Sequence, residues 1–262
     1  MGNFIEKNGI CLHMSFIFCN FAAGFARSHK SAYAYTYKKK MKIALIGYGK
    51  MGHMIEEVAL ERGHEIVARI DMNDAFDLNG ADVAIEFTTP LTAKDNILRA
   101  WAQGVPVISG STGWGPEELE VGDWKLEIEG SRVVVKDEAG KVMLVWSSNF
   151  SVGVNIFFDV NKFLAEKMQH QPQYTPSITE THHIHKLDKP SGTAKTLAEG
   201  IRAIGIPRFR DIEIESIREG EVPGTHEVMW DSEEDTIVIT HIAKGRRGFA
   251  LGAVLAAEEL KL

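Results

Sequence analysis

One short segment, Glu180–Thr193, carries the densest group of chemically reactive side chains and reads ETHHIHKLDKPSGT. Three of the ten histidines of the chain fall within four of its positions: His182, His183 and His185. Histidine titrates near neutral pH, and the neighbouring Lys186 offers a proton and a positive charge. The segment therefore predicts acid–base chemistry.

The same segment ends in PSGT (190–193), at the expected start of a helix. Ser191 or Thr193 can cap this helix, and its free N–H groups suit a carboxylate. Acid–base groups beside a carboxylate cradle indicate a small acidic substrate.

Spacing sets a condition on His182 and Lys186 acting together. They are an even number of residues apart, so an extended strand would place them on one face. At ~3.3 Å per residue they would then be roughly 13 Å apart. Both can reach one substrate only if the chain bends near His185 and Lys186.

Two other interpretations of the segment stay open. Clustered histidines suit zinc, but a closed site needs about four ligands. The chain has no cysteine after Cys19, and His226 and His241 could contribute only through the fold. The second alternative is a polar surface strand whose histidines happen to cluster. We expect no metal.

A glycine-rich turn lies earlier in the chain, between an apolar run at 42–46 and a helical pattern at 50–61. It reads GYGKMG, which is Gly47, Tyr48, Gly49, Lys50, Met51 and Gly52. In this context the spacing predicts a dinucleotide site, with the phosphates at the helix N-terminus.

Asp71 closes the next expected strand, 19 residues after Gly52. An acidic residue there binds an adenosine ribose hydroxyl and would repel a 2′-phosphate, which favours NADH over NADPH. Arg69 lies on the same strand face and could soften that preference.

Two later loops follow expected strands at their carboxyl ends, where open α/β sheets bind ligands. They are Gly110, Ser111, Thr112 and Gly113, and then Ser147, Ser148, Asn149 and Phe150. Small hydroxyl residues and glycines let a nicotinamide ribose approach closely, so both loops are predicted cofactor contacts.

Alternating elements must position these groups. Strands are expected at 42–46, 65–70, 83–87, 105–109 and 142–146, with helices at 50–61 and 91–103. This alternation predicts an α/β fold with an N-terminal Rossmann domain, a doubly wound parallel sheet. After residue 150 we expect helices at 154–168, 193–204 and 249–260, and strands at 177–183, 212–217, 225–230 and 236–242. Consecutive strands indicate a second, mixed α/β domain.

We therefore predict a Rossmann domain at 41–149 plus 241–262, because the last helix is expected to return to it. The second domain is predicted at 150–240.

The composition is that of a globular protein: 262 residues, 44% hydrophobic and 25% charged. The net charge of −7 divides unevenly, with +5 on residues 1–40 and −12 on residues 41–262. An acidic body argues against nucleic-acid binding. The apolar stretch 10–26 is too short and interrupted for a membrane span.

Residues 1–40 differ from the rest, since they hold both cysteines, Cys11 and Cys19, and carry a net positive charge, whereas the remainder of the chain is acidic. Residues 1–40 can be interpreted as a signal peptide or as an organelle transit peptide. We favour a third, an extension upstream of a natural start at Met41, and expect a cytoplasmic protein.

Taken together, the motifs resemble the 4-hydroxy-tetrahydrodipicolinate reductase (dihydrodipicolinate reductase) family of lysine and diaminopimelate biosynthesis. The most specific match is ETHHIHKLDKPSGTA at 180–194. Further matches are GYGKMG (47–52), EFTTP (86–90), SGSTGW (109–114), SSNFSVGVN (147–155), SIREGEVPGTHEV (216–228) and the stretch 240–260. Ser111 departs from the usual threonine but keeps the hydroxyl.

The resemblance implies roles for individual residues. His182 matches the family's catalytic acid/base and Lys186 its proton donor. His183, Gly192, Thr193 and Arg246 match substrate-binding positions, and the glycine turn, Asp71 and the two loops match cofactor positions. It also implies an oxidoreductase using NADH or NADPH, a small dicarboxylate substrate, and a homotetramer assembled through the sheet of the second domain.

Two alternatives remain at this point. One is another two-domain NAD-dependent amino-acid dehydrogenase, which should lack the histidine–lysine segment. The other is a non-catalytic regulator that responds to NAD(H), which should bind the cofactor without turnover.

Overall fold

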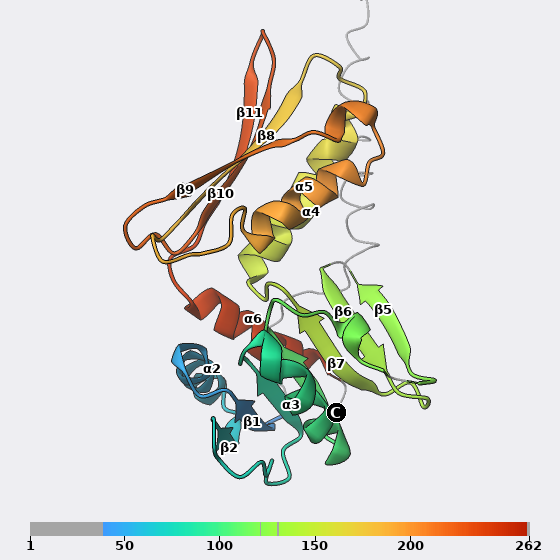
Figure 1. Ribbon diagram of the computed structural model, residues 1–262, viewed down its shortest axis with the longest axis vertical. Coiled ribbons are helices and arrows are strands. Elements are labelled where there is room, and N and C mark those ends of the chain that lie inside the picture. Colours follow the sequence, from blue (N-terminus) through green and yellow to red (C-terminus); the bar gives the residue numbers. More distant parts are fainter. Residues whose placement is uncertain (1–38, 121, 130, 261–262) are drawn as a thin grey trace, which may run out of the picture. The chain divides into compact units, whose positions relative to one another are not determined.

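β1 (Lys42–Ile46) lies inside a parallel sheet, as its continuous apolar sequence predicts. The computed structural model describes residues 39–120, 122–129 and 131–260. Within them, a seven-stranded sheet has the order β2-β1-β3-β4-β7-β6-β5. We call this sheet and its helices the first lobe (Figure 1).

The parallel part of the first lobe is a run of strand–helix units. Its elements are β1, α2 (Lys50–Glu61), β2 (Glu65–Ile70), β3 (Val83–Glu86), α3 (Pro90–Ala102), β4 (Val107–Ser109) and β7 (Val142–Ser147). A short 3-10 helix, η1, spans Pro116–Glu118. All four pairings among these strands are parallel. The predicted doubly wound sheet is confirmed, with boundaries shifted by one or two residues.

A hairpin that the sequence analysis did not predict extends this sheet. β5 (Lys125–Glu129) pairs antiparallel with β6 (Arg132–Lys136), and β6 pairs antiparallel with β7. β5 alternates charged and apolar residues and is mostly exposed, as suits an edge strand. This alternation is a strand signal, so the hairpin could have been predicted from the sequence.

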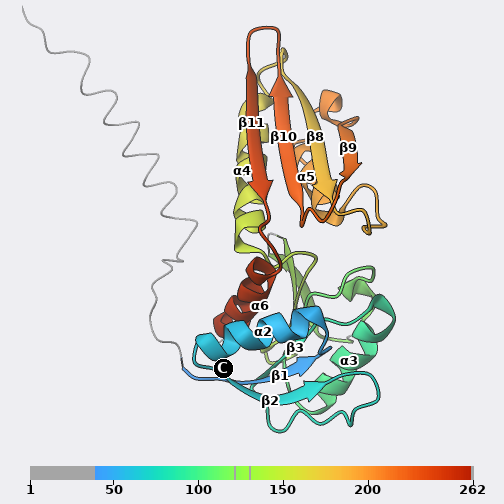
Figure 2. The same cartoon turned by 90° about the vertical axis from the view of Figure 1, so that its left-hand side faces the viewer.

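The last helix, α6 (Arg247–Glu259), packs in the first lobe, as predicted. Its small residues join the core that α2, β1 and β3 form: Ala250, Ala253, Val254, Ala256 and Ala257. Glu258 anchors its end, accepting from Arg62 at 2.6 Å and contacting His64 at 2.9 Å. Figure 2 shows α6 beside α2, with α3 on the other side of the sheet.

A four-stranded mixed sheet, order β11-β10-β8-β9, forms the second lobe of the described chain. Its elements are α4 (Val152–Met168), β8 (Thr175–His182), α5 (Gly192–Arg202), η2 (Pro207–Phe209), β9 (Glu213–Arg218), β10 (Thr225–Asp231) and β11 (Thr236–Ile242). Only β8 and β9 pair in parallel there. The expected mixed sheet is confirmed.

The two faces of this second sheet differ. α4 and α5 cover one face and enclose a core that includes Ile178, Val228 and Trp230 (Figure 2). The other face presents alternate residues such as Thr179, Glu227 and Val238, and no described helix packs on it.

Two further predictions concerned residues 1–40 and the absence of a membrane span. The interpretations of residues 1–40 lie outside the described residues, apart from Lys39 and Lys40. Among the helices that the structure describes, none is long and apolar enough to cross a membrane.

Candidate active site

The predicted glycine turn adopts a conformation that requires its glycines. Gly47 has φ +90°, and a Cβ there would lie 2.2 Å from the carbonyl oxygen of Phe87. A Cβ at Gly52 would lie 2.4 Å from the carbonyl oxygen of Gly47. The turn therefore packs tightly against the end of β3 and brings the start of α2 to the sheet edge.

The N-terminus of α2 is left open to a ligand. Its N-cap is Gly49, which offers no capping side chain, and a Cβ there would meet no atom within 4 Å. The first turn of α2 holds no acidic residue that would occupy its N–H groups. These features fit the phosphates of a dinucleotide.

A cavity of about 260 Å³ opens at the carboxyl edge of the first sheet. Six predicted cofactor residues line it: Met51, Gly110, Ser147, Ser148, Asn149 and Phe150. Arg246, predicted from the resemblance as a substrate contact, lies in the same wall.

Phe87 and Phe249 complete this wall, and the sequence analysis missed both. The position of Phe87, directly after a strand at the binding edge, is the signal that could have identified it. Phe249 follows Arg246 at the start of α6, which only the fold brings here.

Arg69 lies among the residues that are predicted to bind the adenosine end of the cofactor. Its Nε donates to Glu56 at 3.0 Å, and Tyr48 also donates to Glu56. The hydrogen bond from Arg69 is the main cause that holds the pKa of Glu56 below its usual range. Asp71 is exposed, and its Oδ1 accepts the N–H of Met72 at 2.9 Å. The guanidinium of Arg69 is thus occupied, while Asp71 faces solvent.

Ser111 and Thr112, predicted together as cofactor contacts, face different surroundings. Thr112 is exposed. Ser111 is buried, and its hydroxyl donates to Glu86 at 2.8 Å.

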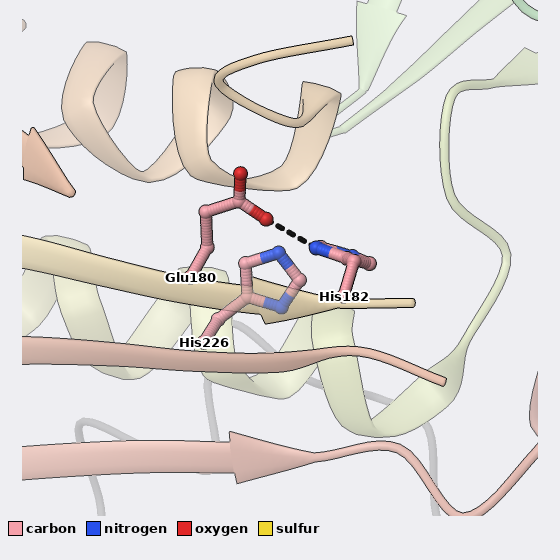
Figure 3. A group of neighbouring side chains, drawn as sticks. All are labelled: Glu180, His182 and His226. Carbon is pink, nitrogen blue, oxygen red and sulfur yellow. Dashed lines mark hydrogen bonds and ion pairs between the residues drawn. The ribbon is translucent and has the colours of Figure 1, made fainter. Parts of the chain in front are cut away.

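The second group of site residues centres on His182, at the end of β8. Its Nδ1 contacts the carboxylate of Glu180, two residues earlier on the same strand face (Figure 3). A carboxylate only accepts hydrogen bonds, so Nδ1 carries the proton and Nε2 keeps a free lone pair. Sequence analysis missed Glu180, although the period of two along a strand could have found it.

The space beside Nε2 is kept clear by a glycine. A Cβ at Gly224 would lie 3.0 Å from Nε2 of His182, and Gly224 has φ +145°. Burial lowers the pKa of His182 and outweighs the opposing effect of Glu180. At neutral pH His182 is therefore a neutral base with its free nitrogen beside a glycine.

Glu180 also contacts two other elements. Its second oxygen accepts from Arg218 of β9 at 3.0 Å and from the backbone N–H of Ser191 at 3.3 Å. Burial alone would raise the pKa of Glu180, but Arg218, Ser216 and His182 together hold it below its usual range. This buried carboxylate therefore stays ionised and joins β8, β9 and the start of α5.

Lys186 lies just beyond a turn, as the spacing argument required. The N–H of Lys186 donates to the carbonyl of His183 at 3.1 Å, and Lys186 Nζ lies 2.8 Å from Asp188. Arg218 fixes this loop by donating to the carbonyls of Lys186 at 3.2 Å and Asp188 at 2.5 Å. The predicted bend is confirmed. Arg218, which the sequence analysis did not identify, stabilises it.

The expected anion cradle lies at the start of α5. Ser191 caps the helix by accepting from the N–H of Ala194 at 3.2 Å. Among the described residues, the N–H groups of Gly192 and Thr193 have no acceptor. The side chain of Asn149 donates to the hydroxyl of Thr193 at 3.2 Å. That bond links the cradle to the cavity wall, and within the described residues His182 and Lys186 make no hydrogen bond or ion pair with the residues that line the cavity.

His226 of β10 lies against His182, with ring centroids 5.0 Å apart. Its Nε2 contacts the hydroxyl of Ser191 at 3.0 Å. Burial, reinforced by the nearby His182, lowers the pKa of His226 to about 4. One ligand atom each of Glu180, His182 and His226 lie within 4.8 Å of one another (Figure 3). Arg218 already balances the carboxylate, so this geometry favours a hydrogen-bonded network over a cation site.

Comparison with known proteins places both halves of the chain in one family. The model described as dihydrodipicolinate reductase, N-terminus, matches residues 41–150, and that for the C-terminus matches residues 153–262. A 4-hydroxy-tetrahydrodipicolinate reductase of Christiangramia forsetii is 43% identical over 233 residues, covering 84% of this chain and 92% of the relative. One of Archaeoglobus fulgidus is 34% identical over 255 residues, covering 83% and 93%.

A solved structure shares the fold. Dipicolinate-bound dihydrodipicolinate reductase from a Paenisporosarcina species superposes with a TM-score of 0.63 at 20% identity, covering 85% of this chain and 95% of that one. These matches do not favour either alternative that the sequence left open, another amino-acid dehydrogenase or a regulator.

Proposed function

The chain belongs to the dihydrodipicolinate reductase family, and from this membership we propose that it reduces 4-hydroxy-tetrahydrodipicolinate with NADH or NADPH. The products are tetrahydrodipicolinate, water and the oxidised cofactor, a step of lysine and diaminopimelate biosynthesis. The observation that carries the proposal is the network in which Glu180 contacts His182, Ser191 and Arg218. One carboxylate there orients the base and ties it to the anion cradle.

The residues present fit a nicotinamide cofactor. The open start of α2 beyond Gly49 suits the pyrophosphate, and Asp71 suits the adenosine ribose. The cavity walled by Phe87, Gly110 and the 147–150 loop suits the nicotinamide end. When bound, the reduced nicotinamide supplies the hydride.

We assign the dicarboxylate to the cradle of Gly192 and Thr193, with His183 and Arg246 as further contacts. Two N–H groups without acceptors at the N-terminus of a helix attract one carboxylate. His183 Nδ1 is buried without a partner among the described residues, so a polar ligand would satisfy it.

Proton transfer falls to His182 and Lys186. The substrate loses its 4-hydroxyl group as water, gains a hydride at carbon and takes up one proton. Lys186, held by its loop near Asp188, supplies the proton. His182 acts as acid/base through Nε2, since Glu180 occupies Nδ1. A positioned acid–base group contributes ~10²–10⁴-fold in rate.

NADH is proposed as the preferred cofactor. The carboxylate of Asp71 would repel a 2′-phosphate, and Glu56 holds the nearby Arg69. A residual preference for NADPH would require Arg69 to leave that ion pair.

The remaining assignments concern organisation. We propose that the Rossmann domain comprises 41–149 plus 241–262 and the substrate domain 150–240. A homotetramer formed through the open face of the second sheet is proposed, as is action in the cytoplasm.

A coupled assay tests the function and cofactor choice together. Freshly generated 4-hydroxy-tetrahydrodipicolinate is added to the protein with NADH or with NADPH, and loss of absorbance at the reduced nicotinamide band is followed. Substrate-dependent oxidation, faster with NADH, is expected. Binding of NADH without any turnover would refute the enzymatic assignment and leave a cofactor-responsive regulator.

A further inference from the structure

Glu86 is a fully buried carboxylate at the last position of β3, and the proposed mechanism gives it no role. Four groups donate to it. Oε1 accepts the N–H of Thr88 at 2.9 Å, the Ser111 hydroxyl at 2.8 Å and the Thr88 hydroxyl, while Oε2 accepts the Ser109 hydroxyl at 2.5 Å. Hydrogen bonds to a carboxylate are stronger when it carries its negative charge, so four donors around one carboxylate favour the ionised form.

No cation balances this charge within the described part of the chain. Glu180, the other fully buried carboxylate among the described residues, has one, because Arg218 pairs with it at 3.0 Å. Burying an unpaired charge costs free energy, so such a group in a native protein calls for a reason.

Glu86 is connected to two residues that line the cofactor cavity. The next residue, Phe87, lines that cavity, and so does Gly110, whose N–H donates to the carbonyl of Glu86 at 3.0 Å. The hydrogen-bond partners of the carboxylate, Thr88 and Ser111, each follow one of these two wall residues. The carboxylate is therefore joined by hydrogen bonds to both loops that contribute residues to the cavity wall.

We propose that Glu86 stabilises the positive charge that the nicotinamide ring acquires when it gives up hydride. The inference rests on the proposed function, which places the nicotinamide in this cavity. Hydride transfer moves two electrons and a proton from a neutral dihydropyridine ring to a substrate carbon and leaves the ring with charge +1. Glu86 exchanges neither proton nor electron and acts through its field.

The same carboxylate holds the two loops that form the wall. Ser111 belongs to the loop after β4, and Thr88 to the loop after β3, so one side chain fixes both. A purely structural role would change the affinity for oxidised and reduced cofactor alike. A field effect would change their ratio, because NAD⁺ and NADH differ in ring charge and share every other group.

The test is the ratio of dissociation constants for NAD⁺ and NADH, measured by titration calorimetry without substrate. Glu86→Gln removes the charge and keeps the shape, with an amide that can still accept from Thr88 and donate to Ser109. We expect the ratio, NAD⁺ over NADH, to rise about tenfold, the effect of one nearby charge at the effective dielectric of a protein site.

Ser109→Ala is the matched control, because it removes one hydrogen bond from the same carboxylate and keeps its charge. It should leave the ratio within about twofold of the original protein. An unchanged ratio in a folded Glu86→Gln variant would overturn the inference.

A second neutral variant covers the case in which Glu86→Gln does not fold. Glu86→Asn removes the charge with a shorter amide, whose oxygen can still accept from the Thr88 and Ser111 groups that a hydrocarbon would leave unpaired. It should show the same rise in ratio, and an unchanged ratio refutes the inference equally. If the original protein binds neither NAD⁺ nor NADH, the proposed function fails; if it binds both and neutral variants keep the ratio, only the role of Glu86 fails.

Discussion

Glu180 and His182 lie two residues apart on β8, and the carboxylate of Glu180 accepts a hydrogen bond from Nδ1 of His182. The pair is buried, and Arg218 holds the other carboxylate oxygen. Glu180 therefore decides which nitrogen of His182 carries the proton and where the ring points.

Glu180→Gln should lower turnover about 10²- to 10³-fold, because an amide can donate to Nδ1 and stabilise the wrong tautomer. Glu180 also raises the pKa of His182, so its loss should move the acidic limb of the kcat/KM profile to lower pH. Steady-state rates from pH 5 to 9 measure both effects. Glu199→Gln, an exposed change on α5, is the control and should keep the original profile.

Lys186→Ala and His182→Ala should each reduce kcat by ~10²–10⁴-fold, the usual contribution of a positioned acid–base group. The dissociation constant for NADH should stay within about threefold, since neither side chain lines the cofactor cavity. Fluorescence titration with NADH measures that constant. Near-normal turnover in both variants would refute their assignment.

Glu56→Gln should raise the NADPH-to-NADH ratio of kcat/KM about 3- to 10-fold. The change releases the guanidinium of Arg69, which then becomes available to a 2′-phosphate. Glu57→Gln is the matched control, because Glu57 is the next residue and pairs with Arg247. An unchanged ratio in Glu56→Gln would show that Arg69 does not reach the cofactor.

Acid should destabilise the protein through His226. Its pKa of about 4 in the folded state lies below the unfolded value of 6.5, so the unfolded state binds more protons between these limits. Stability is then complete above pH 6.5 and falls by up to about 3 kcal/mol as the pH drops to 4. The groups facing His226 are His182, Glu180, His241 and Lys186.

Urea unfolding at pH 7, 5.5 and 4.5 measures this dependence. His226→Gln should reduce the slope between pH 6.5 and 4, because no proton is taken up there on unfolding. His170→Gln, at an exposed position, should keep the original slope. Equal slopes in all three proteins would contradict the role given to His226.

Gly252→Ala should lower stability by about 1–3 kcal/mol and weaken NADH binding. The added Cβ would lie 1.6 Å from the carbonyl oxygen of Phe150, so either α6 or the cavity wall must move. In Gly248→Ala, on the same helix, the added carbon meets nothing closer than Ser151 Oγ at 3.6 Å. Thermal unfolding should separate the two variants, and similar stabilities would contradict this packing argument.

The sequence predicted elements and motifs better than the network that connects them. Buried apolar runs identified β1 and β3, and the glycine turn identified the start of α2. The hairpin of β5 and β6 was missed although β5 alternates charged with apolar residues and β6 contains three consecutive valines, two patterns typical of strands. Boundaries moved by a few residues, as at β8, where pairing with β10 extends the strand to Thr175.

The roles of Arg218 and His226 beside Glu180 were not predicted, for a different reason, and His226 was considered only as a zinc ligand. Arg218 and His226 come from β9 and β10, and only the register of the sheet brings them to Glu180. Glu86 stands at the end of an apolar strand, where the pattern gave no sign of its hydrogen-bonded environment. Contacts between distant segments depend on the tertiary fold, whereas motifs depend on local spacing.

The return of α6 to the first lobe has a consequence for synthesis on the ribosome. Ala250, Val254 and Ala257 complete the core around β1 and β3, yet they are translated after the whole second lobe. The nascent first sheet must therefore keep an apolar face uncovered while residues 152–242 are being made. Domains fold as units during translation, so the lobe whose synthesis begins first should complete its folding last.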